Sequence, residues 1–342
     1  MQYKKILVTG AAGFIGFHLC ETLLEQGVAV VGLDNINDYY DVNLKYARLE
    51  ELGIQQVETE NWDQAVVSIK YPNFRFIRLN LEDREALPQL FEKEAFDAVV
   101  HLAAQAGVRH SLKNPMAYVD SNLVGFANIL ENCRQYKAGH LVYASSSSVY
   151  GESDQVPFEE DARVDYPISL YAATKKANEL MAHSYSHLYK IPTTGLRLFT
   201  AYGPWGRPDM APVLFASAIL DGRSINVFND GDLSRDFTYI DDIIQGIILT
   251  LNNPPLKEKA QPWYQVFNIG NGAPVSLMKF IETLETNLGK VAKKNNLPMQ
   301  PGDVSCTWAD TTKLRLLDYQ SRIPLHEGVR KFVEWYKMYV NR

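Results

Sequence analysis

The stretch TGAAGFIGFHLCETLLEQG, residues 9–27, places a glycine turn between a strand and a helix, and this arrangement is the strongest indication of the fold. The apolar runs KILVT and VAVVGL flank it on the two sides. Gly10, Gly13 and Gly16 are spaced G-x-x-G-x-x-G, which lets a backbone approach a pyrophosphate at the N-terminus of a helix. Three glycines alone are a weak signal, but in this strand–turn–helix–strand setting they predict a dinucleotide site.

The second strand ends in Asp34, and this carboxylate indicates which dinucleotide the site takes. A carboxylate there can accept hydrogen bonds from the hydroxyls of an adenosine ribose, and it would repel a 2′-phosphate. No arginine follows Asp34 directly. These features favour NAD over NADP; the alternative is that Asp34 only ends the strand and caps a turn. The segment HLAAQAG at 101–107 also ends a strand, and its small side chains leave room for a flat ligand.

Short apolar runs alternate with helix-length segments through the first 200 residues. The runs lie at 5–9, 28–33, 74–79, 97–102, 140–144 and 193–199. Near-continuous apolar strands that alternate with helices predict a parallel sheet covered on both faces. The expected fold class is α/β, a Rossmann-like doubly wound parallel sheet with a smaller mixed α/β C-terminal substrate lobe.

The pattern also predicts how the chain is divided. Proline and glycine cluster at 202–212, and the strands beyond are shorter and more scattered. We expect the NAD-binding domain to span 1–200 with a return segment near 235–265, and the remainder of 201–342 to form the substrate lobe. The connection at 35–73 is long and contains YYDVNLKYARLEEL, which predicts an inserted helix.

Composition excludes several classes of partner. The chain has 342 residues, 46% apolar and 22% charged, as is typical of soluble globular proteins. A formal net charge of −6 gives no electrostatic reason to expect nucleic acid or an anionic membrane. We expect no signal peptide and no membrane span, because the N-terminus enters a strand pattern directly and long apolar runs are missing. The three cysteines lack the spacing of a disulfide frame or zinc site and suit buried positions in a cytoplasmic protein.

Two residues four apart, Tyr171 and Lys175, carry the clearest catalytic pattern. On a helix they share one face. A free tyrosine has a pKa of about 10 and is a poor base at neutral pH. A nearby ammonium and the positive ring of NAD⁺ would stabilise the phenolate and lower that pKa. Such a pair removes the proton of an alcohol while the cofactor takes the hydride; the alternative for any isolated Y-x-x-x-K is a solvated helix face.

The glycine turn, the Tyr-x-x-x-Lys pair and the serines of SSSSVYG (145–151) resemble the extended short-chain dehydrogenase/reductase superfamily, most closely its nucleotide-sugar epimerases and dehydratases. The resemblance extends over almost the whole chain, including GPWGRP, SRDFTYIDD, FNIGNG and PGD. In this family the catalytic Ser or Thr precedes the Tyr of the V-Y-G turn by four residues and the catalytic Tyr by about 25. Ser146 lies four residues before Tyr150 and 25 before Tyr171. The resemblance implies that Tyr171, Lys175 and Ser146 are catalytic.

The resemblance also implies a set of cofactor contacts. They are Gly10, Gly13, Phe14, Ile15, Gly16, Asp34, Asn35, Asn80, Leu81, Leu102, Ala103, Ala104, Tyr171 and Lys175. The family often has an acidic residue where this chain has Asn80, near the end of the third strand. An amide oxygen can accept the same hydrogen bond from an adenine amino group.

Three chemistries share such a site: 4-epimerisation, 4,6-dehydration and oxidative decarboxylation. In the family's dehydratases Asp-Glu follows the catalytic hydroxyl, and in its UDP-glucuronate decarboxylases a Glu lies two residues after it. Here Ser147 and Ser148 follow, with no carboxylate. Because elimination lacks its acid and base, the resemblance implies an epimerase.

The sugar is indicated by residues that could bind a C6 carboxylate. Simple UDP-glucose 4-epimerases usually carry Asn in an R-x-F-N segment, where this chain has Thr200. Arg207, the serine quartet and the inserted 34–49 segment resemble UDP-glucuronate 4-epimerases. A carboxylate needs hydroxyl donors and a cation, which Ser147, Ser148, Thr200 and Arg207 supply. The alternative for Arg207 is a surface pair with Asp209.

We therefore expect NAD-dependent conversion of UDP-glucuronate to UDP-galacturonate. The alternatives are a UDP-glucose or UDP-N-acetylhexosamine 4-epimerase, a UDP-glucuronate decarboxylase, or a non-catalytic NAD-binding regulator. By resemblance Arg235 binds phosphate and Asp303 binds ribose. Gln300 stands where simpler epimerases have a second arginine, so phosphate binding is expected to involve Arg109 as well.

Two further expectations concern metals and partners. His183 and His187 could form a zinc pair, but no third ligand or H-E-x-x-H glutamate accompanies them, so no metal site is expected. The elements of a serine hydrolase are not evident. Family members pair through the helix that carries Tyr-x-x-x-Lys and the helix before the fifth strand, here about 170–189 and 115–136. The resemblance therefore implies a homodimer.

Overall fold

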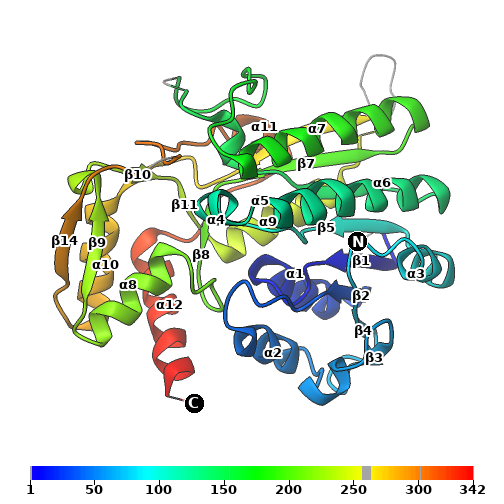
Figure 1. The fold of residues 1–342 in the computed structure, drawn as a ribbon, viewed down its shortest axis with the longest axis horizontal. Helices are drawn as coiled ribbons and strands as arrows, with labels where there is room; N and C mark the ends of the chain where they lie inside the picture. Colours follow the sequence, from blue (N-terminus) through cyan, green and yellow to red (C-terminus); the bar gives the residue numbers. More distant parts are fainter. Residues whose placement is uncertain (1, 154, 256–262, 301, 342) are drawn as a thin grey trace.

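An eight-stranded sheet forms the centre of the computed structural model, which describes residues 2–153, 155–255, 263–300 and 302–341 (Figure 1). The strand order is β12-β7-β6-β5-β1-β2-β4-β3. The strands are β1 (Lys5–Thr9), β2 (Ala29–Asp34), β3 (Ala65–Val67), β4 (Phe74–Arg78), β5 (Ala98–His101), β6 (Leu141–Ala144), β7 (Thr193–Leu198) and β12 (Tyr264–Ile269). All neighbours pair in parallel except β3, which runs antiparallel to β4. The expected doubly wound parallel sheet is confirmed.

The order of the strands reverses on either side of β1, which pairs with β2 and with β5. In doubly wound sheets a ligand binds outside the carboxyl ends of the strands at such a switch point.

All six expected strands are present, each ending within one residue of its apolar run. The sheet strands β12 and β3 were not expected. Of the three residues of β3 two are exposed, so β3 carries little apolar signal.

Helices cover both faces of the sheet, and the alternation of side chains along β1 explains why. Ile6 and Val8 join one apolar cluster and Leu7 joins another. The first cluster lies under α1 (Phe14–Glu25) and α9 (Ile240–Asn252), which pack against each other. The second lies under α3 (Ala86–Glu94), α6 (Phe126–Gln135) and α7 (Leu170–Tyr189). The chain thus returns to the sheet through α9 and β12 after leaving it beyond β7.

The insertion expected after the second strand contains α2 (Val42–Glu51), followed by the short turn η1 (Gln56–Thr59). Asp41 caps α2 by accepting a hydrogen bond from the backbone N–H of Asn43. Between β5 and α6 lie α4 (Val108–Lys113), α5 (Pro115–Tyr118) and the π-helical η2 (Val119–Gly125). The 3₁₀ turn η3 (Ser147–Tyr150) follows β6 after Ser145 and Ser146.

The smaller lobe, on the left in Figure 1, packs α8 (Ala211–Leu220) and α10 (Leu277–Leu288) against a parallel pair, β9 (Ser224–Phe228) and β14 (Lys293–Leu297). Two further pairs connect it to the sheet domain. They are β8 (Thr200–Tyr202) with β11 (Phe237–Tyr239), and β10 (Ser234–Arg235) with β13 (Val275–Ser276). The remaining elements are η4 (Asn229–Gly231), α11 (Thr312–Arg315) and α12 (Leu325–Val340).

Two expectations about single features can be compared with the structure. Cys20 and Cys133 are buried, whereas Cys306 is only partly buried, because it lies beside the short strand β10 near the surface of the smaller lobe. Within the described part of the chain, no helix combines the length and apolarity needed to cross a membrane.

Candidate active site

A cavity of about 1000 Å³ runs from the carboxyl ends of the parallel strands into the smaller lobe. With the exception of Asn80, every residue predicted for the site lines it. The glycine turn and the second strand line one end, the serine turn and α7 the middle, and residues of the smaller lobe the other end. The tertiary structure therefore brings together, in one cavity, side chains that lie between positions 10 and 303 of the sequence.

The cofactor end of the cavity is shaped by glycines. Gly10 has φ +75°, and a Cβ there would lie 2.8 Å from the backbone nitrogen of Ala103 on the neighbouring strand end. A Cβ at Gly16 would collide with the carbonyl oxygen of Gly10. Only glycine allows this close packing of turn, helix and strand end, and it leaves the N-terminus of α1 open to a pyrophosphate. The cradle fits a dinucleotide.

Asp34 lies at the ribose end of that cradle. Its carboxylate accepts hydrogen bonds from the backbone N–H groups of Ala12 (3.2 Å) and Ile36 (2.8 Å). The ammonium of Lys45, from the inserted helix α2, lies 3.9 Å from the same carboxylate. Asp34 is thus fixed in place and retains acceptor capacity for ribose hydroxyls.

Asn80 differs from the other predicted cofactor residues in its placement. Its side-chain oxygen accepts a hydrogen bond from Asn35 Nδ2 at 3.1 Å, and it does not line the cavity. Asn35, Leu81 and Glu82 do line it. Asn80 can therefore support Asn35, while its own contact with adenine stays a prediction.

Tyr171 and Lys175 project from the first turns of α7. Ser169 begins the helix, since its hydroxyl accepts a hydrogen bond from the backbone N–H of Ala172 at 3.1 Å. Lys175 is 3% exposed and donates to the carbonyl oxygen of Ala144, the last residue of β6, at 2.8 Å. Burial lowers the pKa of Lys175 to about 8. The ammonium is therefore held at the strand end on the same helix face as Tyr171, but its proton is weakly bound for a lysine.

Opposing effects act on the Tyr171 phenol. Burial raises its pKa, while a hydrogen bond with Ser146 and the positive charge of Arg207 lower it, and the net result is a raised pKa. Both lowering groups were predicted for the site from the sequence. The phenol would need further positive charge from a bound cofactor to ionise near neutral pH.

The serines of the 145–148 turn face two different environments, the cavity and a buried ion pair behind it. Ser146 begins η3, accepting a hydrogen bond from the backbone N–H of Ser148 (3.1 Å) and donating to its hydroxyl (3.2 Å). Ser147 and Ser148 line the cavity. Ser145 points the other way and donates to Glu179 Oε1 at 2.7 Å.

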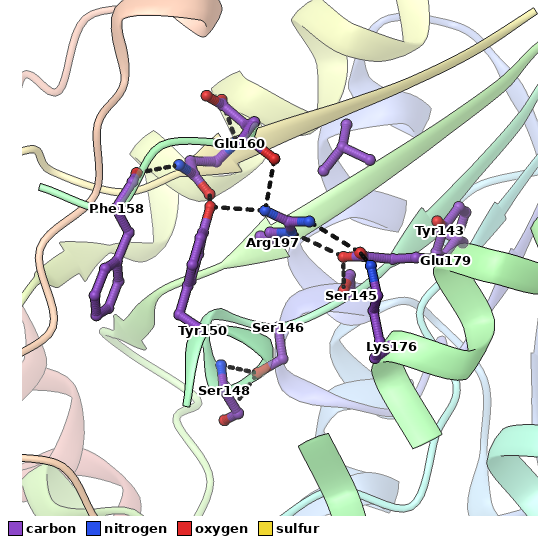
Figure 2. A network of polar contacts seen from close by, with 12 residues as sticks. Tyr143, Ser145, Ser146, Ser148, Tyr150, Phe158, Glu160, Lys176, Glu179 and Arg197 are labelled. Carbon is purple, nitrogen blue, oxygen red and sulfur yellow. Dashed lines mark hydrogen bonds and ion pairs between the residues drawn. The ribbon is translucent and has the colours of Figure 1, made fainter. Parts of the chain in front are cut away.

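Figure 2 shows the buried ion pair behind this turn. Arg197 donates to both carboxylate oxygens of Glu179, each at 2.9 Å, and its Nη1 donates to the hydroxyl of Tyr150 at 3.0 Å. Glu179 belongs to α7 and Arg197 to β7, three residues before Thr200. The pair therefore ties both ends of the serine turn, at Ser145 and Tyr150, to the helix of Tyr171 and the strand that leads to Thr200.

The far end of the cavity is rich in cations that share one carboxylate. Asp303 lies 2.6 Å from Arg235 Nη2 and 3.8 Å from Arg109 Nη2. The guanidinium of Arg109 also lies over the ring of Phe228, 5.4 Å from its centroid. Gln300 lines the cavity beside them. Two arginines, a carboxylate and an aromatic ring suit a phosphorylated nucleoside.

Arg207 lies in the middle of the cavity wall. It forms two hydrogen bonds with Asp209, of 3.0 Å and 2.6 Å. The pairing considered from the sequence is thus present, but it lines the cavity, and the Arg207 side chain is only 21% exposed. The hydroxyl of Tyr39, from the inserted segment, donates to Asp209 at 2.9 Å.

The family model for the NAD dependent epimerase/dehydratase family matches residues 6–270. The chain belongs to this family. A probable UDP-glucuronate 4-epimerase from Rhizobium meliloti is 46% identical over 345 residues, which cover 97% of this chain and 96% of that protein. A UDP-glucuronate 4-epimerase from Thermodesulfobacterium geofontis is 45% identical, covering 97% and 95%. The crystal structure of UDP-glucuronic acid 4-epimerase from Bacillus cereus with UDP-glucuronic acid and NAD matches with a TM-score of 0.85 and 36% identity, over 98% and 99% of the two chains.

Within this epimerase fold, several side chains at the site were missed by sequence reasoning. They are Tyr39, Lys45 and Phe228, which line the cavity, and Glu179, which accepts a hydrogen bond from Ser145. Tyr39 and Lys45 belong to the inserted segment that the sequence singled out only as a subgroup feature. The signal that could have found Glu179 is its position four residues beyond Lys175, on the same face of α7.

Proposed function

We propose that the protein is an NAD-dependent UDP-sugar 4-epimerase that interconverts UDP-glucuronate and UDP-galacturonate. One observation carries the choice of sugar: Ser147, Ser148, Thr200 and Arg207 line the same cavity as Tyr171. Hydroxyl donors and a cation around one space provide what a C6 carboxylate requires. The similarity to proteins named UDP-glucuronate 4-epimerase supports the same substrate.

The reaction begins with proton removal from the C4 hydroxyl by Tyr171, with Ser146 bridging the two oxygens. Lys175 stabilises the phenolate electrostatically and is itself aligned by the Ala144 carbonyl. The glycine turn and Asp34 would hold NAD, which would supply the hydride acceptor for C4 and the donor for the return of that hydride. The proton on Tyr171 is then given back to the C4 oxygen, so protons and hydride are both conserved.

Epimerisation is favoured over elimination by the residues beside Ser146. Removal of water across C5 and C6 needs a general acid and a general base near those carbons. The two side chains that follow Ser146 are hydroxyls, which are poor acids and bases at neutral pH. Ser147 and Ser148 therefore cannot supply the acid and base for dehydration of the 4-keto sugar, which is reduced again at C4.

A 4-keto glucuronate carries its carboxylate on the carbon next to the ketone and is a β-keto acid. It loses CO₂ when the carboxylate bond aligns with the ketone π system. The enzyme must let the ring turn over, so that hydride returns to the other face, while it keeps this bond out of alignment. Hydrogen bonds from Ser147, Ser148, Thr200 and Arg207 make the carboxylate a pivot and stabilise the negative charge that decarboxylation would disperse.

The UDP group is assigned to the arginine-rich end of the cavity. Arg235 and Arg109 provide charge for the phosphates, and Asp303, which pairs with both, can accept hydrogen bonds from ribose hydroxyls. Phe228 offers a flat apolar surface near Arg109. In keeping with this assignment, we place the NAD-binding domain at 1–200 with 235–265, and the nucleotide-sugar lobe in the remainder of 201–342.

The test is an assay of the purified protein with UDP-glucuronate, UDP-glucose and UDP-N-acetylglucosamine, with products separated by chromatography and identified by mass spectrometry. We expect UDP-galacturonate from UDP-glucuronate and at least tenfold lower kcat/KM for the two neutral sugars. Tyr171→Phe provides the inactive control. Turnover of a neutral sugar with no turnover of UDP-glucuronate would overturn the proposal.

We also propose that the protein is a cytoplasmic homodimer. Leu180 and Leu188 on α7 and Met116 on α5 are exposed apolar residues on the two segments through which family members pair. Burial of these side chains between two copies would stabilise a dimer. Light scattering at micromolar concentration should give twice the mass of the chain, and a monomer would contradict the proposal.

The cytoplasmic part of the proposal is supported by Cys20 and Cys133, which are buried and form no disulfide, as suits a reducing compartment.

A further inference from the structure

Tyr39 belongs to the inserted segment between β2 and α2, and its side chain reaches the middle of the cavity. Its hydroxyl donates to Asp209 Oδ2 at 2.9 Å. The ring is held on two sides, by His110 with ring centroids 4.7 Å apart and by the Arg207 guanidinium 5.7 Å from the ring centroid. The hydroxyl also lies so close to Gly107 that a Cβ at that position would collide with it. Tyr39 is therefore fixed before any substrate arrives.

Asp209 connects Tyr39 to Arg207, because it is hydrogen-bonded to both side chains. Burial alone raises the pKa of Asp209, but the charge and hydrogen bonds of Arg207 and the hydrogen bond from Tyr39 hold it below its usual value. Asp209 is therefore an anion. Each of its carboxylate oxygens accepts a hydrogen bond from Arg207, and Oδ2 also accepts one from the Tyr39 hydroxyl. The two bonds occupy the Nε and Nη2 side of the guanidinium and leave its remaining edge for a second anion.

The backbone of the segment that carries Arg207 is anchored independently. The carbonyl of Pro204 lies 3.0 Å from His18 Nε2 on α1. The carbonyl of Trp205 accepts from Arg48 Nε (3.2 Å) and Nη2 (2.6 Å). Since these contacts fix the main chain, loss of the Tyr39 hydroxyl would release the side chains of Asp209 and Arg207 without moving the segment itself.

We infer that Tyr39 is a positioning residue for the sugar carboxylate, acting through Asp209 on the orientation of Arg207. The inference rests on the proposed function, because it assigns Arg207 to a carboxylate of the substrate. Tyr39 sits on the inserted segment and Arg207 on the segment after β8, so the two halves of the cavity would share the recognition of this group.

The test compares Tyr39→Phe with wild type and with Tyr46→Phe. Tyr46 lies on α2, within the same inserted segment as Tyr39, but does not line the cavity, so it controls for loss of a phenol from the segment. With UDP-glucuronate we expect Tyr39→Phe to raise KM about three- to tenfold, the effect of one lost hydrogen bond. We expect the fraction of decarboxylated UDP-pentose to rise, while the inhibition constant for UDP stays within twofold of wild type.

A double-mutant cycle distinguishes positioning from a direct contact of Tyr39. Asp209→Asn should also raise KM for UDP-glucuronate, and adding Tyr39→Phe to it should have less than half of the effect that Tyr39→Phe has alone. Equal KM and equal pentose fraction for Tyr39→Phe, Tyr46→Phe and wild type would overturn the inference and leave the proposed function intact. If the inhibition constant for UDP rises by as large a factor as KM does, the inference would also be overturned. A wild-type protein inactive on UDP-glucuronate would overturn the proposed function first.

Discussion

Glu179→Gln tests whether the buried ion pair in Figure 2 holds the active site together. Glu179 is 4% exposed and shares two hydrogen bonds with Arg197 and one with Ser145. Burial alone lowers the pKa of Arg197, but the hydrogen bonds and charge of Glu179 raise it above its ordinary value. The substitution keeps the shape of the side chain but leaves the guanidinium charged and without its counter-ion.

The size of the effect follows from this burial. Removing one partner of a buried pair costs about 3–5 kcal/mol, because the remaining charge is uncompensated. The amide oxygen of Gln can still accept from Arg197, and Tyr150 and the carbonyl of Glu160 also accept from it. We therefore expect the lower end, about 3 kcal/mol, and a fall in Tm of roughly 6 °C, at about 2 °C per kcal/mol for a chain of this length.

Urea and thermal unfolding at fixed NAD concentration provide the measurement, with Glu282→Gln as the matched control. Glu282 pairs with Lys279 at 3.4 Å on the surface, where the two side chains are 61% and 66% exposed. Removing such a pair should change the free energy of unfolding by less than about 0.5 kcal/mol. Glu179→Gln should also lower kcat, because both ends of the serine turn lose their anchor. Equal unfolding midpoints for the two variants would refute this account of the pair.

Three further predictions concern the reaction and its pH dependence. Tyr171→Phe and Lys175→Ala should fold but lose about 10²–10⁴-fold in kcat, whereas Ser146→Ala should lose less because water can relay the proton; wild-type kcat in Tyr171→Phe would exclude the mechanism. Since burial lowers the pKa of Lys175 from 10.5 to about 8, the unfolded chain binds more protons between these values. The free energy of unfolding of wild type relative to Lys175→Ala should therefore rise with pH across that window, and a constant difference in urea titrations would contradict it. Thr200→Ala and Ser147→Ala should lower epimerisation and raise the fraction of UDP-pentose and of reduced cofactor, as measured by mass spectrometry and absorbance; lost activity without more pentose would weaken the case for glucuronate.

Local patterns in the sequence were sufficient for the sheet and for the residues that meet the cofactor turn and the reacting carbon. Apolar runs of five to seven residues predicted six of the eight sheet strands, because a buried parallel strand has to be apolar on both faces. The spacing of the glycine turn, of Tyr171 with Lys175 and of Ser146 before them was equally informative, since each depends on a turn or a single helix face. β3 was missed because it has only three residues, two of them exposed. β12 was missed because it joins the sheet beside β7, a strand distant from it in the chain.

The pairing of charges across the chain was decided only by the tertiary structure. Tyr39 meets Asp209, Lys45 meets Asp34 and Glu179 meets Arg197 because separate elements are packed against one another. No periodicity in the sequence encodes such a contact, since the partners lie on different elements and their distance depends on the whole packing. The fold class, the family resemblance and the predicted catalytic set follow from the amino-acid sequence alone. The tertiary structure determined which side chains hold that set in place, because a carboxylate or guanidinium acquires its partner only when folding brings it out of water and next to an opposite charge.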